Sequence, residues 1–447
     1  MLDHGDVVFG QFEQSRAAAA VFRTCMRAGA VFVPVDPSWP PYLIHKAAAR
    51  LAPRVVIAKP DALHDLAAIF AGAAALSIED AANEIVARPD QAPLSEYLSA
   101  AYLFTSGSTG VPKLVMHSRR SLNHSAALVL RTFGWRCGER LLNLAELHTM
   151  SGLRNALVAA EMGGIEWLPS PTSERATIFD LIALIGESGC ERLVAGPSLV
   201  RHLALLGDRL DRAPFAGLKA IYCTGAALSA AASQALHARL NLPIVNYYGL
   251  TETGGLCLSQ DVADWDPADT SLGRPVGCEA RLVTADGSIG EQGELQIRSP
   301  QIMSGYLGDA AATAARFDGD WLRTGDIMMR DREDRFHLRG RADLFINTRR
   351  TERIHPEEIE NVLELHPQVS EAAVVGVEDP NGGERVVALI VLHAGWDLTA
   401  CSHRAMAQFV VDKLGQSRMP NEVRFLNRLP RLASGKLSRV ALPELAQ

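Results

Sequence analysis

The chain of 447 residues carries 44 Lys and Arg against 51 Asp and Glu, so its formal net charge is −7. This balance argues against a broad nucleic-acid surface and against membrane attachment through basic segments. Hydrophobic residues make up 48% and charged residues 21%, which excludes intrinsic disorder for most of the chain. The longest apolar run, Val386 to Leu392, has seven residues and is too short to span a membrane.

The N-terminus and the cysteines point to a cytoplasmic protein. No basic stretch followed by an apolar stretch opens the chain, so we expect no secretory signal peptide. Seven cysteines lie far apart and form no CxxC pair. We therefore expect reduced thiols and no zinc ribbon.

The first sixty residues alternate between strand and helix signals. An apolar face over 15–28 predicts a helix that ends at Gly29, and Pro40-Pro41 predicts the start of a second helix. The expected strands are 6–9, 31–35 and 54–58. This β-α-β-α-β order predicts a parallel sheet covered by helices.

The same rhythm continues to about residue 257 and then changes. An apolar face over 122–133 predicts a helix ending at Gly134. Gly, Pro and Asp become frequent after residue 257, which indicates a twisted, partly antiparallel β region. The expected strands are 101–104, 114–117, 218–223, 243–248, 279–283 and 293–298.

A domain boundary is predicted near residue 340, giving an N-terminal domain of residues 1–340 and a compact α+β domain of residues 341–447. Pro356 is expected in the first turn of a helix in the second domain. Asp379 to Gly383 is a turn signal between two apolar strands, which favours a hairpin. The other expected elements are strands at 372–377, 386–392 and 422–426 and a helix at 403–414.

The strongest chemical signal is the segment TSGSTGVPK at 105–113, which lies between two expected strands. Glycines let backbone N–H groups face an anion, and hydroxyls and a lysine add donors and charge. The segment differs from the GxxxxGK[ST] loop because Lys113 follows Gly110 by three residues and precedes Leu114. The physical interpretation is a polyphosphate loop, and the alternative is a flexible polar turn.

Three further segments suit nucleotide chemistry, although each alone is more typical of an ordinary turn. In YYGLTE at 247–252, an aromatic ring can stack on a base and a carboxylate can hold Mg²⁺. In WLRTGD at 321–326, an acidic residue in a tight turn can bind two ribose hydroxyls. The segment SGKLSR at 434–439 puts a lysine on a loop near the C-terminus.

Together and in this order, the motifs resemble the AMP-forming adenylating superfamily, which contains acyl- and aryl-CoA synthetases, adenylation domains and luciferases. The segment GAVFVPVDP at 29–37 resembles a family segment ahead of the phosphate loop. The resemblance covers nearly the whole chain, from about residue 6 to residue 439. The motifs that carry it are TSGSTGVPK at 105–113, YYGLTE at 247–252, GEL at 293–295, RTGD at 323–326, GRAD at 340–343 and SGK at 434–436.

The resemblance implies an α/β fold and a two-step reaction. The large N-terminal domain would contain parallel-rich sheets with helices plus a distorted β region, and a small α+β C-terminal domain would be mobile. A carboxylate would attack the α-phosphate of ATP and release pyrophosphate. A thiol of CoA or of a carrier-bound phosphopantetheine would then displace AMP.

The resemblance also assigns the nucleotide to particular residues of the N-terminal domain. Tyr248 would stack on adenine, Thr251 would contact the α-phosphate and Glu252 would hold Mg²⁺. The β- and γ-phosphates would be held by Thr105, Ser106, Gly107, Ser108, Thr109, Gly110 and Lys113.

The remaining assignments fall toward the C-terminus. Asp326 would bind the ribose hydroxyls with Arg341 nearby, and Asp343 matches the hinge position. Lys436 would bridge the acid and the α-phosphate. A lysine suits that role because it supplies positive charge where charge shifts among phosphate oxygens in the transition state.

The acid site is expected around His148, because His148 to Gly152 resembles the HxxxG segment of acyl- and aryl-acid ligases. The aspartate that amino-acid-selecting domains use for the substrate ammonium is missing here, so the resemblance favours an acid without an α-amino group. Tyr247 and the small residues Gly225 and Ala226 are expected to line the site. The identity of the acid stays open, because apolar pockets separate homologues by only about 1–3 kcal/mol per methylene.

Two departures from the family leave alternatives open. The chain begins later than family members usually do, so a homodimer or a partner chain is a possible cover for the N-terminal sheet. After the hinge position, Arg349 and Arg350 stand where a glycine is usual. They block the thiol tunnel, meet phosphates of CoA or acidic groups of a carrier protein, or simply form a solvated basic loop. The leading hypothesis is a CoA ligase; the alternatives are an enzyme that loads an acyl-carrier protein and a non-catalytic remnant that binds nucleotide or a partner.

Overall fold

The computed structural model divides the chain into two compact units. The first contains Met1–Ala280 and Gln296–Arg323, and the second contains Arg281–Leu295 and Thr324–Gln447. The structure describes all residues except 49, 87–93, 106–111, 162–165, 170–176, 226–227, 229, 343, 349–352, 381–382, 394–401, 432–436 and 447.

The first unit opens with a seven-stranded sheet of order β16-β6-β5-β2-β1-β3-β4. Strands β1 to β5 run parallel, which confirms the prediction made for β1, β2 and β3, whereas β6 returns antiparallel to β5 and β16 lies antiparallel to β6. The strands are β1 Val7–Gln11, β2 Val31–Val35, β3 Val55–Ala58, β4 Ala74–Leu76, β5 Ser99–Thr105, β6 Lys113–Ser118 and β16 Gly305–Tyr306.

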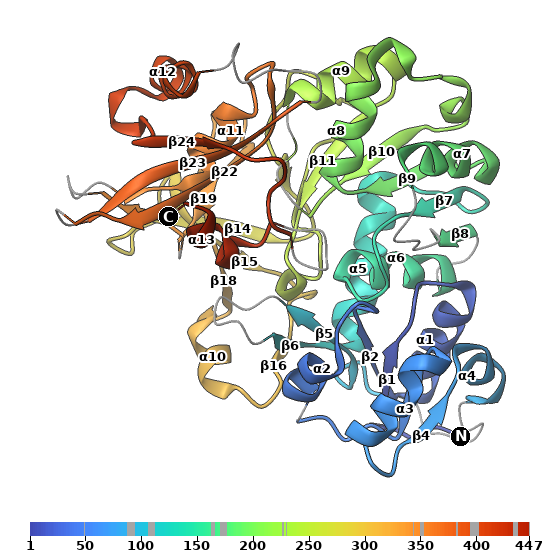
Figure 1. Ribbon diagram of the computed structural model, residues 1–447. Helices are drawn as coiled ribbons and strands as arrows, with labels where there is room; N and C mark the ends of the chain where they lie inside the picture. The colour runs from blue at the N-terminus through green and yellow to red at the C-terminus, as the bar shows by residue number, and fades with distance from the viewer. Residues whose placement is uncertain are drawn as a thin grey trace. The chain divides into compact units, whose positions relative to one another are not determined.

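Five helices in the described part of the chain accompany this sheet, and Figure 1 shows α1, α3 and α4 beside its blue strands. Helix α1 begins after Ser15, whose hydroxyl accepts the N–H of Ala18, and ends at Gly29, which adopts the left-handed φ of 70°. Gly134 ends α5 in the same way with φ of 61°. Both predicted helix ends are thus confirmed. The helices are α1 Arg16–Ala28, α2 Pro41–Ala48, α3 Pro60–Ile69, α4 Ile78–Glu84 and α5 Arg119–Phe133.

A second seven-stranded sheet has the order β13-β12-β11-β10-β9-β7-β8. It is parallel from β8 to β11 and antiparallel at β12 and β13. Its strands are β7 Arg140–Asn143, β8 Glu166–Pro169, β9 Arg192–Ala195, β10 Ala220–Cys223, β11 Ile244–Tyr248, β12 Leu258–Ser259 and β13 Arg274–Pro275.

The helices of this part connect the strands, and α5 and α6 lie side by side, as do α8 and α9 (Figure 1). The α-helices are α6 Met150–Glu161, α7 Ile178–Ser188, α8 Pro197–Leu206, α9 Ala230–Leu240 and, after β16, α10 Ala310–Ala315. Short 3₁₀ turns are formed by Gly207–Arg209, Ala213–Phe215 and Thr251–Thr253.

The core between α5 and the second sheet is aromatic. The ring of Phe133 lies 4.4 Å from that of Tyr222 and 5.3 Å from that of Tyr247, and Trp135 packs against both Phe133 and Tyr222. Large buried rings of this kind contribute much of the hydrophobic stabilisation of a core. This cluster fixes the end of β11 from which the YYGLTE segment continues.

The second unit combines the predicted twisted β region with an α+β part. Strands β14, β15, β18 and β17 form one sheet in that order, and β19 pairs with β18. Strands β14, β15 and β18 each begin in one unit and end in the other, and β17 belongs to the first unit. The strands are β14 Glu279–Val283, β15 Gln292–Arg298, β17 Phe317–Asp318, β18 Trp321–Arg330 and β19 Phe336–Arg341.

The C-terminal elements agree with the sequence. Strands β22 and β23 form the predicted antiparallel hairpin, and β24 adds to β23 in parallel. Pro356 stands in the first turn of α11, as predicted. The elements are β20 Ile346–Asn347, β21 Arg353–Ile354, α11 Pro356–Leu363, β22 Val369–Glu378, β23 Glu384–Leu392, α12 His403–Leu414, β24 Glu422–Phe425 and α13 Leu442–Ala446, with 3₁₀ turns at Gln416–Arg418 and Arg439–Ala441.

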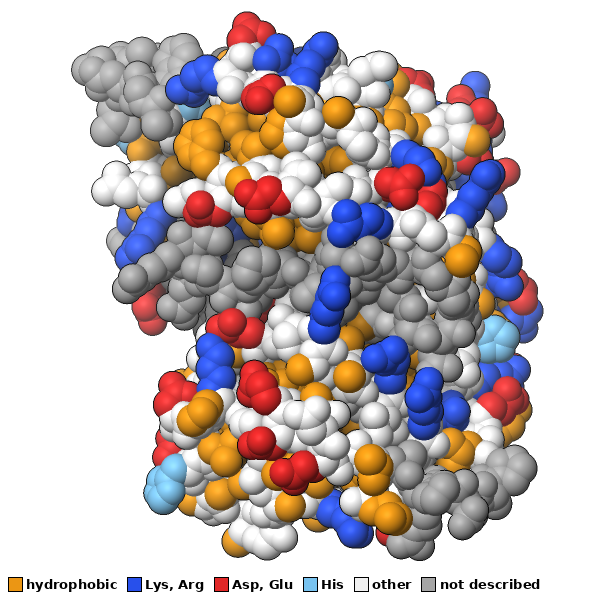
Figure 2. Space-filling view, turned by 90° about the vertical axis from the view of Figure 1, so that its right-hand side faces the viewer, with side chains coloured by type: hydrophobic (Ala, Val, Ile, Leu, Met, Phe, Trp, Pro, Cys, Tyr) orange, Lys and Arg blue, Asp and Glu red, His pale blue; other side chains and the backbone are white. Residues whose placement is uncertain are grey.

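The α/β fold class is as predicted, and the placing of the boundary at residue 340 stays a prediction. Among the residues that the structure describes, no helix is both long and apolar enough to cross a membrane. On the face drawn in Figure 2, basic and acidic side chains are interspersed rather than gathered by sign.

Candidate functional site

The predicted phosphate loop is held between two paired strands. Thr105 ends β5 and lies directly opposite Lys113, the first residue of β6. The antiparallel ladder thus fixes both ends of the loop. The loop residues Ser106, Gly107, Ser108, Thr109 and Gly110 lie outside the described residues.

Tyr306 connects the base of this loop to the YYGLTE segment. The ammonium of Lys113 lies 5.0 Å from the ring centroid of Tyr306, a cation–π distance. The hydroxyl of Tyr306 donates to Oε1 of Glu252 over 2.8 Å. Lys113, predicted to hold the phosphates, and Glu252, predicted to hold Mg²⁺, therefore contact the same tyrosine, although 139 positions separate them in the sequence.

Glu252 is a buried carboxylate with neighbours on one oxygen. Glu252 is 6% exposed. Nη2 of Arg316 lies 3.7 Å from Oε1 of Glu252, and Nε of Arg316 donates to the Tyr306 hydroxyl over 3.1 Å. Oε2 has no hydrogen-bond partner among the described residues. Burial, with a smaller effect of the nearby charge of Glu252, raises the pKa of Tyr306 to about 12, so its hydroxyl remains a donor at neutral pH.

A donor set of this kind fits a magnesium ion held mainly by phosphate oxygens. Mg²⁺ in nucleotide sites takes one or two carboxylates and completes its shell with phosphate and water. In the described part of the chain, no group of three or more His, Cys, Asp and Glu side chains gathers to hold a metal without such help. Glu252 is therefore a fitting ligand only in company with a nucleotide.

His117 supports the same segment and is a residue that sequence reasoning missed. Its Nε2 lies 2.8 Å from the Thr251 carbonyl oxygen, and its Nδ1 lies 3.0 Å from the Ser121 hydroxyl. A carbonyl only accepts, so Nε2 carries the proton of the neutral ring. Burial lowers the pKa of His117 to about 4, despite the opposing effects of the Thr251 carbonyl and the Glu252 charge. A neutral histidine thus holds the backbone of the predicted α-phosphate residue.

The two tyrosines of YYGLTE lie in different environments, because successive side chains of a strand point to opposite faces. Tyr248 is half-buried, which leaves part of its ring available for the predicted adenine contact. Tyr247 is 1% exposed and packs in the aromatic core. Its hydroxyl lies 3.4 Å from the Ser151 hydroxyl and 3.3 Å from Nη2 of Arg154.

Gly249 is required by packing where the segment leaves β11. A Cβ at this position would lie 2.3 Å from the carbonyl carbon of Gly255 and 2.5 Å from the nitrogen of Leu256. These atoms belong to the backbone and cannot move aside cheaply. The glycine lets the chain turn back on itself directly ahead of Thr251 and Glu252.

The predicted acid site lies at the start of α6. His148 stands between two carboxylates, with Nδ1 3.1 Å from Glu146 and Nε2 3.8 Å from Asp36. Gly152 packs against the preceding loop so closely that a Cβ would lie 1.8 Å from the Glu146 carbonyl oxygen. Close packing therefore requires a glycine at this position of the HxxxG segment.

The small-residue turn of the acid site is described only in part. Gly225 follows β10, is exposed and adopts a left-handed φ of 97° that favours glycine. Ala226 lies outside the described residues.

In the second unit, Asp326 and Arg341 form the cross-strand pair that the ribose assignment needs. They lie opposite each other on β18 and β19, and Nη1 of Arg341 donates to Oδ1 of Asp326 over 2.9 Å. Asp326 is 4% exposed. The register of β18 and β19 thus brings Arg341 to Asp326, because a slip of one residue would turn the two side chains to opposite faces of the sheet.

For the predicted catalytic lysine and the predicted hinge residue, the structure describes only residues that are near them in the sequence. Asp343 and Lys436 lie outside the described residues, as do Arg349 and Arg350. Arg439, three positions after Lys436, donates to both carboxylate oxygens of Glu360 over 2.6 and 2.8 Å. This ion pair fixes to α11 the segment that follows the lysine.

Comparison with known proteins decides the family. A family model described as AMP-binding enzyme matches residues 2–307, and one described as AMP-binding enzyme C-terminal domain matches residues 358–436. The chain belongs to the AMP-forming adenylating enzymes. The resemblance inferred from the motifs is thereby confirmed.

Curated relatives of this adenylating enzyme are CoA ligases. The sulfoacetate–CoA ligase of Cupriavidus necator is 33% identical over 348 residues, which are 77% of this chain and 66% of that ligase. The 2-succinylbenzoate–CoA ligase of Bacillus licheniformis is 30% identical, with 82% of this chain and 74% of that ligase covered. The indoleacetate–CoA ligase of Aromatoleum aromaticum is 28% identical over 94% of this chain and 84% of that ligase.

Solved structures confirm the fold. The anthranilate CoA ligase AuaEII in complex with anthranoyl-AMP superposes with a TM-score of 0.90 at 23% identity, covering 100% of this chain and 88% of that one. ATP-bound MatB from Rhodopseudomonas palustris gives a TM-score of 0.88 at 24% identity, covering 99% and 89%. At these identities the likeness concerns the fold alone.

Proposed function

We propose that this adenylating enzyme is an acid–thiol ligase that makes an acyl-adenylate and transfers the acyl group to CoA. A carboxylate oxygen bonds to the α-phosphorus of ATP while the bond to pyrophosphate breaks. The CoA sulfur then bonds to the acyl carbon, its proton is lost, and AMP leaves. The observation that carries the proposal is the convergence of Lys113 and Glu252 on Tyr306 within a chain whose family motifs stand in order.

Each named residue has a task that its chemistry allows. The loop from Thr105 to Lys113 would hold the β- and γ-phosphates through backbone N–H groups and charge. Mg²⁺, when bound, supplies neutralising charge to the phosphates, and Glu252 would hold it. Asp326 would bind the ribose hydroxyls. Lys436 would stabilise the charge that develops at the α-phosphate.

We propose that the acid lacks an α-amino group. The substrates in the names of the relatives do not narrow the class of acid further. Their names span sulfoacetate, indoleacetate, oxalate and long-chain fatty acids. His148, Tyr247, Gly225 and Ala226 are the residues that we propose to border the acid.

Acid-dependent exchange of labelled pyrophosphate into ATP tests the adenylation step. Lys436→Ala should reduce the exchange rate by about 10²-fold or more, the effect of losing one well-placed electrostatic group. Lys413→Ala is the matched control, because Lys413 is an exposed lysine on α12 of the same unit. Exchange that survives in Lys436→Ala would contradict the role of the lysine, and a wild-type chain without exchange for any acid would favour a nucleotide-binding remnant.

A thioester assay then tests the acceptor. Formation of acyl-CoA from CoA supports the ligase, whereas formation only on a phosphopantetheinyl carrier supports the loading enzyme. Arg349→Ala with Arg350→Ala in one variant should change the KM for CoA at low salt if these arginines border the thiol path.

A further inference from the structure

Arg316 contacts the predicted metal ligand, although it belongs to none of the sequence motifs and has no task in the proposed reaction. It directly follows helix α10, and its side chain is 24% exposed. Its Nε donates to the Tyr306 hydroxyl over 3.1 Å, and its Nη2 lies 3.7 Å from Oε1 of Glu252. Arg316 thus reaches the carboxylate both directly and through the tyrosine.

The start of β18 fixes the direction of the Arg316 side chain. Its Nη1 donates to the carbonyl of Arg323 over 3.1 Å, and the N–H of Arg323 donates to the Arg316 carbonyl over 2.8 Å. Arg323 lies on β18, which pairs with β17 directly after Arg316. The guanidinium is therefore held between a strand and the predicted metal ligand.

Tyr306 is fixed as firmly as the arginine. It lies opposite Val115 of β6, its N–H donates to the Thr313 hydroxyl over 2.9 Å, and the residue is 5% exposed. Guanidinium nitrogens only donate, so the Tyr306 oxygen accepts from Arg316 and its own proton is directed to Glu252. Arg316 thereby determines the direction in which the hydroxyl of Tyr306 donates.

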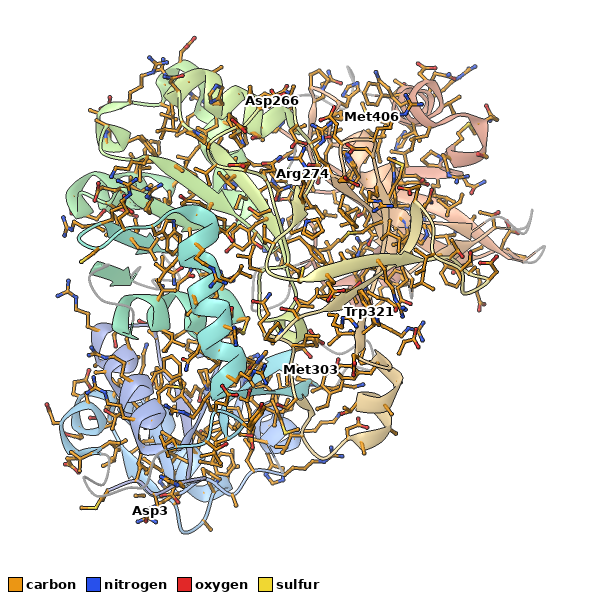
Figure 3. The ribbon with its side chains drawn as sticks, turned by 180° about the vertical axis from the view of Figure 1, so that it is seen from behind. Asp3, Asp266, Arg274, Met303, Trp321 and Met406 are labelled. Carbon is orange, nitrogen blue, oxygen red and sulfur yellow. The ribbon has the colours of Figure 1, made fainter. Side chains whose placement is uncertain are left out.

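These contacts engage one carboxylate oxygen of Glu252 and leave the other. Oε1 accepts from Tyr306 and faces Arg316. Oε2 has no partner among the described residues and is not one of their fully enclosed oxygens without a partner. The backbone is held too, because the Glu252 carbonyl accepts the N–H of Met303, which Figure 3 labels, over 2.9 Å. Glu252 therefore presents a single oxygen, Oε2, to a ligand.

Glu139 shows how a purely structural carboxylate of the same unit is held. Arg192 donates to both of its oxygens, over 2.9 Å to Oε1 and 3.1 Å to Oε2. Lys219 adds a donor to Oε1, and the N–H of Arg136 adds one to Oε2. Both oxygens of Glu139 are thus engaged, whereas the donors at Glu252 gather on Oε1.

We propose that Arg316 and Tyr306 make the site selective for Mg²⁺ over Ca²⁺ by restricting Glu252 to one metal-binding oxygen. Mg²⁺ demands near-ideal octahedral geometry at about 2.0–2.1 Å and is satisfied by one carboxylate oxygen, phosphate oxygens and water. Ca²⁺ takes about 6–8 oxygens at about 2.3–2.6 Å and gains from a carboxylate that binds through both oxygens. With Oε1 engaged by the tyrosine and the arginine, Glu252 does not offer that arrangement. The inference rests on the proposed function, since it concerns the metal that accompanies ATP, and it makes Arg316 a positioning residue for Glu252.

Binding of ATP without an acid tests the inference, because no adenylate forms and the readout is an affinity rather than a rate. Isothermal titration calorimetry gives the Kd for ATP with saturating Mg²⁺, with saturating Ca²⁺ and with a chelator. We expect Mg²⁺ to tighten ATP binding to wild type about 10-fold more than Ca²⁺ does, the scale of one hydrogen bond to a charged group. Equal tightening by the two metals, or no effect of either metal, would overturn the inference.

Variants separate selectivity from structural support. Arg316→Met should reduce the ratio of the Kd with Ca²⁺ to the Kd with Mg²⁺ by about 3- to 10-fold, because Oε1 loses the guanidinium and the Tyr306 proton is no longer directed to it. Arg316→Lys should keep part of the ratio, and Arg316→Met with Tyr306→Phe should reduce it further. Arg131→Met, at an exposed arginine of α5, is the matched control and should leave it unchanged.

Thermal unfolding without ligands checks that each variant is folded. If Arg316→Met unfolds, Tyr306→Phe alone carries the same test, because it removes the donor to Oε1 and should also reduce the ratio. A loss of ATP affinity that is equal with both metals, in the single and the double variant, would assign Arg316 to the packing of the site and overturn its role in selectivity.

Comparing binding with exchange distinguishes failure of the inference from failure of the proposed function. ATP binding that prefers Mg²⁺, without pyrophosphate exchange for any acid, would contradict the ligase and support the selective site. Exchange in wild type together with equal ATP affinities in Mg²⁺ and Ca²⁺ would support the ligase and contradict the selective site.

Discussion

Replacing His117 with leucine tests whether a neutral buried histidine supports the Thr251 backbone. The change removes the donor to the Thr251 carbonyl and the contact with the Ser121 hydroxyl. Both groups keep one other partner, since Gly254 donates to Thr251 and Ser121 donates to Ser118. We therefore expect the free energy of unfolding at pH 7.5 to fall by about 2 kcal/mol. Leaving a buried polar group unsatisfied costs about 1–3 kcal/mol, and here each of the two groups loses only one of its partners.

The pH dependence carries the sharper test. Burial holds the pKa of His117 at about 4, against 6.5 for an ordinary histidine. Below pH 6.5 His117 becomes protonated in the unfolded chain but stays neutral in the folded chain. Wild type therefore loses stability as the pH falls toward 4. A difference of 2.5 pKa units corresponds to about 3 kcal/mol. The leucine variant has no such proton to bind, so the gap between the two proteins should close on acidification.

Equilibrium urea unfolding at several pH values between 7.5 and 5 measures this gap. His124→Leu is the matched control, because His124 is exposed on the same helix α5 and its loss should leave the pH dependence unchanged. His117→Gln should recover part of the stability through its amide donor. A gap between wild type and His117→Leu that stays constant across the pH range would refute the assignment of a neutral buried ring.

Three further predictions concern other contacts of the first unit. Glu139→Gln should reduce the free energy of unfolding by about 3–5 kcal/mol in urea titrations at pH 7, because it leaves the guanidinium of Arg192 buried without a charge partner. Burial alone would raise the pKa of Glu139, but hydrogen bonds from Arg192 and Lys219 lower it to about 2. Wild type should therefore lose this stabilisation only as the pH falls below 4.5 toward 2. Tyr306→Phe should raise the Mg²⁺ concentration needed for half-maximal exchange, because Glu252 loses the hydroxyl that orients it, and an unchanged Mg²⁺ titration would count against that orientation. Gly152→Ala should lower the unfolding temperature and the exchange rate together, because its Cβ would overlap a backbone oxygen at 1.8 Å; a normal thermal transition would show that the loop can move aside.

The sequence predicts elements well where the signal is local. The ends of α1 and α5 are marked by Gly29 and Gly134, which adopt the left-handed conformation that glycine tolerates best. The hairpin of β22 and β23 is marked by a turn between two apolar runs. The order of short motifs is also a property of the sequence, and it identifies the family before any contact is known.

Contacts between distant positions are what the sequence leaves out. His117 reaches the carbonyl of Thr251 across 134 positions, and Tyr306 reaches Glu252 across 54. Neither residue belongs to a motif, so no local pattern marks it. Arg154 likewise belongs to no motif, and only the packing of α6 inside the first unit makes it a buried charge.

The path of the chain through the two units has a consequence for synthesis. The chain passes from one unit to the other after Ala280, after Leu295 and after Arg323. During translation, the first unit cannot be completed until residue 323 has left the ribosome, and by then the segment from 281 to 295 has already emerged with most of its own unit still to be made. For that interval β15 can pair with β14 but still lacks its second neighbour β18, and this open strand edge is a risk for aggregation. Each of the three crossings falls inside a strand, namely β14, β15 and β18, so exchanging a unit between two relatives would join half-strands of different origin in one sheet.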